Sequence, residues 1–357
     1  MPTVMPTIVP TILLTGAAGY IGSHTWLALL AAGFKVVGLD DFSNSSPRVL
    51  DRLARLSGQA PTFERADIND SAAVDSVFSR HSIDAVVHFA AFKSVGESVA
   101  HPLRYYRNNV GGLVNVCQAM QRHDCARMVF SSSATVYGDP ASLPIREDFP
   151  LSATNPYGQT KLIGEALLRD LGSASAAPLG SDTSCAPWQS ACLRYFNPVG
   201  AHASGLIGED PRGIPNNLMP FVAQVASGRR DRLQVFGNDW PTADGTGVRD
   251  YIHVLDLADG HVAALRHLLD QAGSFTLNLG TGQGHSVLDL VRAYSTASGR
   301  EIPLQMAPRR PGDIAACWAD ASLAAQRIGW RATHDLTQMC SDSWRWQTLN
   351  PHGFDSP

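Results

Sequence analysis

The chain has 357 residues, 44% of them hydrophobic and 17% charged, which is ordinary globular usage in a length sufficient for two domains. A formal net charge of -4 gives no basic surface for nucleic acid or anionic membranes, and no apolar run approaches the roughly 18 residues that span a bilayer. The N-terminal segment 1–11 is interrupted by prolines and lacks the positive region of a signal peptide. The six cysteines show no metal-ligand spacing. We therefore expect a cytoplasmic protein with free thiols, no metal site, and neither nucleic acid nor a membrane as partner.

Short aliphatic runs alternate with helical patterns along the first part of the chain. The sequence predicts strands at 11–16, 35–41, 83–91, 126–138 and 191–200, helices at 19–33, 51–58, 101–123 and 157–171, and a polar surface loop at 172–190. Strands that alternate with helices predict a doubly wound parallel sheet of the Rossmann type. From about residue 197, glycine, proline and asparagine become frequent, which indicates a loop-rich lobe that shapes a pocket. The expected fold class is α/β, with a nucleotide-binding Rossmann domain over 1–196. A smaller mixed α/β substrate-binding domain is expected over 197–357, with parts of 250–282 returning to the first domain.

The first predicted strand runs into a turn with three glycines, Gly16, Gly19 and Gly22. Between a strand and a helix, such glycines let the backbone approach a pyrophosphate at the helix N-terminus, although the spacing G-x-x-G-x-x-G is a weak signal by itself. Asp40 ends the second strand, where a carboxylate accepts hydrogen bonds from ribose hydroxyls and repels a 2′-phosphate. The pair of features favours NAD over NADP. Asp67 follows a further β-like run, and its side chain either reaches the adenine or is a solvated helix-start residue.

Residues 155–161 read NPYGQTK, which places Tyr157 and Lys161 four residues apart just after Pro156. Proline is well tolerated at the first position of a helix, so both side chains are expected on one face of its first turns. A cation beside the phenol favours the phenolate and lowers the tyrosine pKa, as a base at neutral pH requires. Taken alone, the pair is more often a helix-start tyrosine beside a solvated lysine.

Longer motifs carry a resemblance to a known family. They include HFAAFKSVGES (88–98), FSSSATVYGD (130–139), LRYFNPVGAH (193–202) and, most specific of all, DGTGVRDYIHVLDLADGH (244–261). From residue 11 to about 352 the chain resembles the extended short-chain dehydrogenases/reductases, and more narrowly the UDP-glucose (UDP-galactose) 4-epimerases. The resemblance implies a tightly bound NAD, a UDP-sugar substrate, a homodimer and a role in galactose metabolism.

The resemblance also assigns residues to the site. It implies that Tyr157 and Lys161 are catalytic, that Ser133 bonds the sugar 4-oxygen, and that Phe196 lies against the nicotinamide. The cofactor-binding set comprises Gly16, Gly19, Tyr20, Ile21, Gly22, Asp40, Asp41, Phe42, Ser43, Asn44, Ser45, Asp67, Ile68, Phe89, Ala90, Ala91, Lys93, Asn108, Tyr157, Lys161 and Phe196. The substrate-binding set comprises Lys93, Ser133, Tyr157, Asn197, Asn216, Asn217, Leu218, Gln234, Val235, Phe236, Arg249, Arg310, Asp313 and Cys317. Arginines suit a diphosphate, which prefers guanidinium forks. Arg309 is expected on a solvated face, and His88, His101 and His253 are expected to be structural.

The expected chemistry is the inversion of a secondary alcohol carbon. This requires breaking a C–H bond, and no side chain accepts a hydride, whereas bound NAD does. Tyr157 as phenolate takes the hydroxyl proton, Lys161 stabilises the phenolate, and the resulting 4-ketose turns over before the same hydride returns to its other face. Two alternatives stay open. One is a nucleotide-sugar 4,6-dehydratase, whose acid–base carboxylates are replaced here by Ala134 and Thr135; the other is a non-catalytic NAD-sensing protein.

Two finer expectations concern substrate range and assembly. Cys317 falls on a sugar-pocket wall position where many bacterial relatives carry tyrosine. Its small side chain predicts that UDP-N-acetylglucosamine and UDP-N-acetylgalactosamine are interconverted as well. In the homodimer implied by the resemblance, the helix containing 105–120 and the helix after Tyr157 pack against their symmetry mates.

Overall fold

A computed structural model describes residues 9–176, 187–213, 215, 217–310 and 312–355. Its centre is a seven-stranded parallel sheet whose spatial order is β11-β6-β5-β4-β1-β2-β3. The strands are β1 (Thr11–Thr15), β2 (Lys35–Asp40), β3 (Thr62–Arg65), β4 (Ala85–His88), β5 (Arg127–Ser133), β6 (Gln189–Tyr195) and β11 (Phe275–Leu279). The α/β doubly wound fold expected from the sequence is confirmed.

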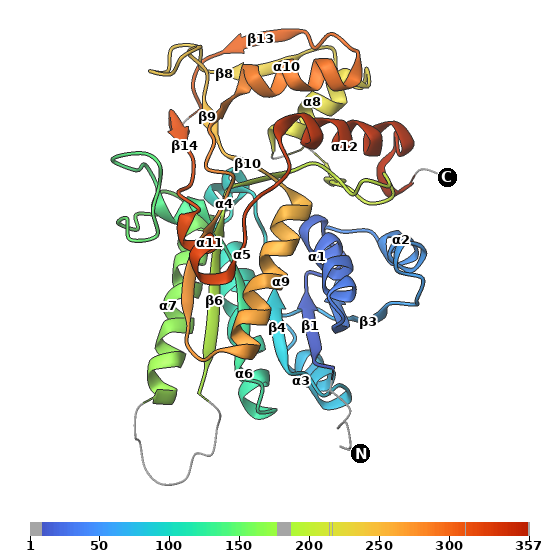
Figure 1. Cartoon of the computed structure of the whole chain (residues 1–357), viewed down its shortest axis with the longest axis vertical. Helices are drawn as coiled ribbons and strands as arrows, with labels where there is room; N and C mark the ends of the chain where they lie inside the picture. Colours follow the sequence, from blue (N-terminus) through green and yellow to red (C-terminus); the bar gives the residue numbers. More distant parts are fainter. Residues whose placement is uncertain (1–8, 177–186, 214, 216, 311, 356–357) are drawn as a thin grey trace, which may run out of the picture.

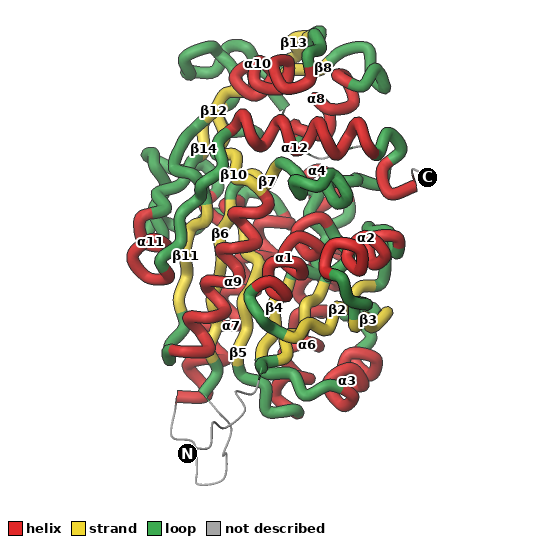
Figure 2. Tube along the Cα trace, turned by 45° about the vertical axis from the view of Figure 1, so that its right-hand side comes forward, coloured by secondary structure: helices red, strands yellow, loops and turns green. Residues whose placement is uncertain are grey.

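Helices cover both faces of this sheet, which explains why its strands are apolar at successive positions. Ile12 and Leu14 of β1 face α1 (Tyr20–Ala31), α2 (Arg48–Ser57) and α9 (Val254–Asp270), whose Trp26, Leu53 and Leu265 complete that core. Leu13 points to the opposite face, toward α3 (Ser71–Arg80), α6 (Gly112–Arg122) and α7 (Pro156–Ala176). Figure 2 shows the sheet between its helical layers, with a second lobe above it.

The second lobe has its own core of smaller elements (Figure 1). Three helices, α8 (Leu218–Ala226), α10 (Val287–Ser298) and α12 (Leu336–Leu349), pack with the parallel pair β8 (Leu233–Phe236) and β13 (Leu304–Ala307). Short strands connect the lobes: β7 (Asn197–Val199) with β10 (Tyr251–His253), and β9 (Val248–Arg249) between β12 (His285–Ser286) and β14 (Ala316–Cys317). None of the helices in the described part of the chain is both long and apolar enough to cross a membrane.

Several elements differ from the sequence expectation. The helix expected over 101–123 is interrupted: α4 (Val95–Ala100) and α5 (Pro102–Tyr105) precede a π-helical stretch η1 (Tyr106–Gly111) before α6 begins. The strand expected over 126–138 ends at Ser133, and a 3-10 turn η2 (Ala134–Tyr137) follows. Residues 172–176, expected as loop, continue α7, whereas 177–186 lie outside the described residues.

The chain also returns to the sheet after it has begun the second lobe. Strand β11 pairs with β6, and α9 lies against α1, so part of 250–282 belongs structurally to the sheet. Helix α11 (Ser322–Ile328) rejoins the same side, where the Trp330 indole donates to the backbone oxygen of Asp256 at 2.9 Å. The return of 322–330 to the sheet was not expected from the sequence. A short 3-10 turn, η3 (Gly353–Asp355), ends the described chain.

Candidate active site

A cleft of about 1110 Å³ lies between the carboxyl ends of the sheet strands and the second lobe. In open α/β sheets, ligands bind at this edge, because the loops that follow parallel strands meet there. All described residues of the two expected binding sets line the cleft except Phe42. Asn216 lies outside the described residues. Residues separated by long stretches of sequence, such as Gly16, Ser133 and Arg310, are therefore brought to one cavity.

Phe42 points elsewhere because of its backbone. Its φ of 62° lies in the left-handed region, and its ring stacks on Phe63 with the ring centroids 5.0 Å apart. The backbone amide of Phe42 still serves the site, because it donates to the Asp40 carboxylate at 2.9 Å. The contribution of Phe42 to the cleft is thus to hold Asp40 rather than to line the cavity.

The glycine turn fits a dinucleotide phosphate on steric grounds. A Cβ on Gly22 would lie 2.2 Å from the Gly16 backbone oxygen, and a Cβ on Gly16, whose φ is 68°, would lie 2.8 Å from the Ala90 nitrogen. Gly19 is the N-cap of α1 and supplies no capping side chain, so the helix begins with amides that face the cleft. A helix N-terminus of this kind is a ready anion site, and the donor set fits the phosphates of NAD.

Asp40 is held by three donors of the chain itself. Its Oδ2 accepts from the Ala18 amide at 3.0 Å, and its Oδ1 accepts from the Phe42 amide and from the Ser45 hydroxyl at 2.8 Å. Burial raises the pKa of this carboxyl, and the three hydrogen bonds oppose that rise. Each carboxylate oxygen has about two lone-pair sites, so Oδ2 keeps one for a ribose hydroxyl. Asp67 uses one oxygen locally, on the amide and side chain of Asn69, both at 2.8 Å.

Tyr157 and Lys161 lie on α7, which begins at Pro156 as expected. The Asn155 side chain accepts from the Gly158 amide at 2.9 Å and so caps the helix start. Lys161 is 3% exposed, and its Nζ donates to the Ser131 backbone oxygen at 2.7 Å. The same Nζ lies 5.9 Å from the Tyr157 ring centroid and 5.2 Å from that of Phe130. The two side chains therefore share one buried corner of the cleft.

The electrostatics of this pair correct the sequence expectation. Burial raises the pKa of Tyr157 to about 12, and a side-chain hydrogen bond with Ser133 acts in the opposite direction. Burial also lowers the pKa of Lys161 to about 7, against the influence of Glu165. The expectation that Lys161 lowers the tyrosine pKa is thus wrong for these residues by themselves, because desolvation disfavours both charged forms. The contact that favours the phenolate comes from Ser133.

A buried ion pair behind the site was not expected from the sequence. Arg194 on β6 binds Glu165 on α7 through two contacts, of 2.9 and 2.6 Å, and both side chains are less than 8% exposed. The Ser132 hydroxyl donates to the same carboxylate at 2.5 Å. Glu165 lies one helical turn after Lys161, so this network fixes the face of α7 that carries Lys161 against β5 and β6.

The second lobe supplies the cationic wall of the cleft. The Arg310 guanidinium lies 4.7 Å from the Phe236 ring centroid, and its Nε donates to Asp313 at 3.0 Å. Arg249 on β9 is the register partner of Cys317 on β14. Arg230 and Arg232 also line the cleft, although they were not selected from the sequence. The arginine-rich motif GRRDRL (228–233) could have indicated them.

Arg309 makes contacts that the sequence did not predict, whereas His88, His101 and His253 are not part of the cleft lining. Arg309 is not simply solvated: its Nε donates to Asp239 at 2.7 Å, and its guanidinium covers the Trp240 ring at 3.9 Å. His253 caps α9 by accepting from the Leu255 amide at 3.0 Å. Neither it nor His88 nor His101 is among the described residues that line the cleft.

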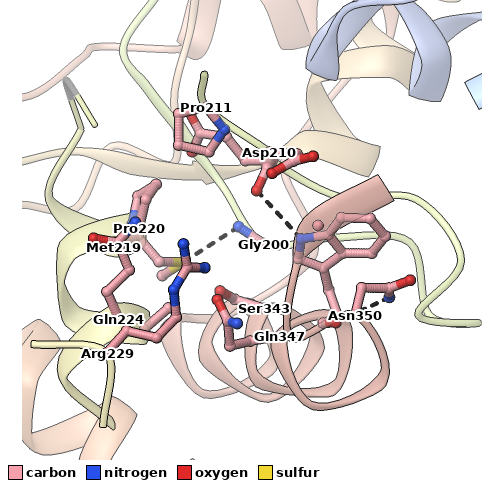
Figure 3. Close-up of a pocket in the computed structure, with 14 residues that line it drawn as sticks. Gly200, Asp210, Pro211, Met219, Pro220, Gln224, Arg229, Ser343, Gln347 and Asn350 are labelled. Atoms are coloured by element: carbon pink, nitrogen blue, oxygen red, sulfur yellow. Dashed lines mark hydrogen bonds between the residues drawn. The ribbon is translucent and has the colours of Figure 1, made fainter. Parts of the chain in front are cut away.

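A smaller cavity, of about 40 Å³, is lined by residues that include Met219, Arg229 and Ser343 (Figure 3). Glu209, Asp210 and Pro211 line both this cavity and the main cleft. On the cleft side, Glu209 accepts from Lys93 at 3.3 Å and from Asn217 at 2.8 Å, which links the two lobes. The small cavity is not lined by Ser133, Tyr157 or Lys161, so the main cleft is the candidate active site.

Comparison with known proteins assigns the chain to a family. A family model described as GDP-mannose 4,6 dehydratase matches residues 13–343. The UDP-glucose 4-epimerase of Bacillus subtilis (strain 168) is 57% identical over 344 residues, which cover 96% of this chain and 98% of that protein. The chain belongs to the UDP-glucose 4-epimerase family. The resemblance inferred from the motifs is confirmed, and the protein is an enzyme, an isomerase acting on carbohydrates.

Solved structures of epimerases match the fold closely. A UDP-glucose 4-epimerase from Stenotrophomonas maltophila, with bound NAD and formylated UDP-arabinopyranose, has a TM-score of 0.90 and 52% identity; the match covers 95% of this chain and 98% of that one. A UDP-glucose 4-epimerase from Bifidobacterium longum, in complex with NAD+ and UDP, has a TM-score of 0.90 and 50% identity, with coverage of 96% and 99%. The cofactor of the epimerase fold described here is NAD.

Proposed function

We propose that the protein interconverts UDP-glucose and UDP-galactose by inverting C4 of the sugar through a 4-keto intermediate, a reaction of galactose metabolism. The observation that carries the proposal is the meeting of Tyr157, Lys161 and Ser133 in one cleft, between a glycine turn and an arginine-lined wall. The ligands of the structural neighbours, NAD with UDP or with a UDP-sugar, support a UDP-sugar substrate here. In this proposal residues 1–196 bind mainly the cofactor and 197–357 mainly the UDP-sugar.

The proposed cofactor-binding residues lie mainly at the strand ends: the glycine turn, Asp40, Asp41, Ser43 to Ser45, Asp67 and Ile68, Phe89 to Ala91, Lys93 and Phe196, with Asn108 from η1. NAD bound there supplies a hydride acceptor for the C4 hydrogen, which the side chains cannot be. Asp40 accepts a ribose hydroxyl, and Lys161 uses the ammonium hydrogens not given to Ser131 to hold the second ribose. Tyr157 and Phe196, which line the same cleft, would then hold the nicotinamide end.

The chain's own residues handle the proton. Tyr157 takes the proton from the sugar 4-hydroxyl and returns it after inversion, and Ser133 holds the 4-oxygen by a hydrogen bond. The pKa of about 12 for the tyrosine alone makes the phenolate scarce at neutral pH, so the reaction needs cationic groups beside it. Lys161 in its protonated form would be one, and the positive charge of a bound NAD would be a second. We propose that bound cofactor thereby restores the acidity that burial removes.

The UDP end of the substrate is proposed to bind tightly and the sugar loosely. Arg249 and Arg310 offer guanidinium forks for the diphosphate, with Asn197, Asn216, Asn217, Leu218, Gln234, Val235, Phe236 and Asp313 around the nucleotide. Inversion requires the sugar to present both faces at one site. This is possible only if its hydroxyls make few fixed contacts with the protein. An apolar wall that includes Cys317, Phe196 and Ile314 supports this loose fit.

The dehydratase alternative is less well supported than epimerisation, although the matched family model is described as a 4,6 dehydratase. Loss of a 6-hydroxyl needs an acid–base carboxylate after β5, and Ala134 and Thr135 stand at those positions. A non-catalytic NAD sensor would not need Tyr157, Lys161 and Ser133 together. The deciding experiment uses protein purified without added nucleotide. We expect it to carry NAD and to interconvert UDP-glucose and UDP-galactose; release of a 4-keto-6-deoxy sugar, or no turnover by a folded protein, would contradict the proposal.

We further propose that UDP-N-acetylglucosamine and UDP-N-acetylgalactosamine are substrates. Cys317 is 9% exposed, lines the cleft next to Arg249, and ends in one sulfur atom. Burial raises the pKa of its thiol to about 11, so it presents a neutral surface. A tyrosine at this position would occupy on the order of 80–90 Å³ more, space that an acetamido group needs in a close-packed wall.

The protein is proposed to act as a homodimer in the cytoplasm. Val99 and Leu103, on α4 and α5 beside α7, are 63% and 83% exposed. Large exposed apolar side chains close to α7 support the expected packing of this region, with the helix over 105–120, against a symmetry mate. A monomer at micromolar concentration in light scattering would contradict the dimer. The five described cysteines are free and buried, which suits a reducing compartment, and Cys185 lies outside the described residues.

A further inference from the structure

Ser133 receives two hydrogen bonds from a single neighbour, Thr135. Its Oγ accepts from the Thr135 backbone amide at 3.2 Å and from the Thr135 hydroxyl at 3.0 Å. A serine hydroxyl has two lone pairs and one proton. Because both lone pairs are taken, Ser133 faces the cleft as a donor and not as an acceptor.

Tyr157 lies where this donor is needed. Ser133 and Tyr157 both line the cleft and are buried, and the serine side chain acts on the phenol by lowering its pKa. Thr135 is wedged against the start of α7: a Cβ on Gly158 would lie 3.0 Å from the Thr135 backbone oxygen and 3.3 Å from its Oγ1. The 3-10 turn that follows β5 therefore places Thr135 between the serine and the helix that carries the catalytic tyrosine.

We propose that Thr135 is a positioning residue for the epimerase reaction, because its donation to Ser133 fixes the serine proton on the oxygen of Tyr157 or on the sugar 4-oxygen. The inference rests on the proposed function, since that function assigns Ser133 and Tyr157 their roles. In the proton step the sugar O4–H bond breaks and the tyrosine O–H bond forms, while the serine proton stays on Ser133. Thr135 itself lines the cleft, and in this proposal it acts through the serine.

Two physical effects follow from this arrangement. Hydroxyls that donate in series polarise one another, so the Ser133 proton is a better donor when Thr135 donates to its oxygen. A fixed donor also favours the phenolate of Tyr157 over the phenol. Among the described residues, the other titratable groups that face Tyr157 are Lys161 on α7, with its Nζ 5.9 Å from the ring centroid, and Tyr195 at the end of β6. Neither contact changes when the Thr135 hydroxyl is removed.

The test is Thr135→Val in the holoenzyme, because valine keeps the shape and the backbone amide and removes only the hydroxyl. For UDP-galactose we expect kcat to fall roughly three- to tenfold, the value of one hydrogen bond, with KM unchanged. The acidic limb of the kcat/KM pH profile should move upward by about half a pH unit to one unit, since the phenolate loses support. Thr135→Ser, which keeps a hydroxyl, should restore both kcat and the position of the acidic limb. In a Ser133→Ala background, Thr135→Val should have no further effect, because the serine that transmits it is gone.

Three outcomes would overturn the proposal: an unmoved pH profile, a raised KM with normal kcat, or full additivity with Ser133→Ala. The second would mean that Thr135 contacts the sugar directly. NAD content of the purified variant checks that it folds, and Thr135→Ala, smaller and also without a donor, replaces the valine variant if that one is insoluble. A parent protein without epimerase activity would refute the proposed function. An active parent whose profile Thr135→Val leaves unmoved would refute only the role of Thr135.

Discussion

Lys161 is a buried cation, and we expect its replacement by methionine to stabilise the nucleotide-free protein while it abolishes turnover. The side chain is 3% exposed, and burial lowers its pKa to about 7. In the unfolded chain the amine keeps a pKa of roughly 10.4. A gap of about three pH units corresponds to roughly 4 kcal/mol of unfolding free energy. Methionine cannot make the hydrogen bond that Lys161 donates to the Ser131 backbone oxygen. This loss offsets about 1 kcal/mol of the stabilisation and leaves a net gain of about 3 kcal/mol in unfolding free energy.

The gain has a defined pH dependence. Below about pH 7 the lysine is charged in both states, and the folded protein bears the full cost of a buried charge. Between about pH 7 and roughly 10.4 the folded lysine is neutral while the unfolded one still binds a proton, so the cost falls as pH rises. The advantage of Lys161→Met is therefore largest near neutral and mildly acidic pH and shrinks toward alkaline pH.

The assay is urea unfolding, followed by tryptophan fluorescence, at about pH 6.5 and about pH 9.5. Parent and Lys161→Met are compared with Lys35→Met, a matched control at the exposed first residue of β2. We expect Lys161→Met to raise the unfolding free energy at the lower pH and much less at the higher pH, with the control within about 0.5 kcal/mol of the parent. A Lys161→Met protein less stable than the parent at the lower pH, or an equal gain at both, would refute the reasoning.

Three further changes test the site. Tyr157→Phe should preserve folding and NAD content and lower kcat by roughly two to four orders of magnitude, the loss of a general base, so near-normal kcat would exclude that role. Asp40→Ala should weaken NAD in equilibrium binding and narrow its preference over NADP, because the carboxylate that repels a 2′-phosphate is gone; an unchanged preference would locate the discrimination elsewhere. Cys317→Tyr should abolish turnover of the N-acetylated pair and largely spare the glucose pair. If the unmodified protein turns over only the glucose pair, the argument from pocket volume fails.

Features carried by a short stretch of sequence were predictable. Two examples are the strand–glycine–helix turn at Gly16 to Gly22 and the start of α7 at Pro156. In both, the residue types by themselves favour the backbone conformation that is found. That the strand ends meet in one cleft follows from parallel topology, which the alternation of strands and helices already indicates. The long helix expected over 101–123 was only partly right, because the π-helical stretch at 106–111 leaves the helical pattern of the sequence almost unchanged.

Features that depend on burial or distant contacts were not predictable. Spacing places Lys161 beside Tyr157 but does not give the desolvation that raises one pKa and lowers the other. The Glu165–Arg194 pair joins residues 29 positions apart in the sequence, and Arg309 meets Trp240 from another loop. Phe42 leaves the cleft because of a positive φ that its residue type disfavours.

The central claim is that one hydrogen leaves C4 of the sugar and returns to C4 within a single site. It is tested most directly by supplying UDP-galactose labelled with deuterium at C4 to protein purified without added nucleotide, and by reading the label in the product by NMR. The account predicts UDP-glucose with the deuterium retained at C4 and none exchanged with solvent. Loss of the label to water, or turnover only when NAD is supplied in stoichiometric amounts, would contradict it.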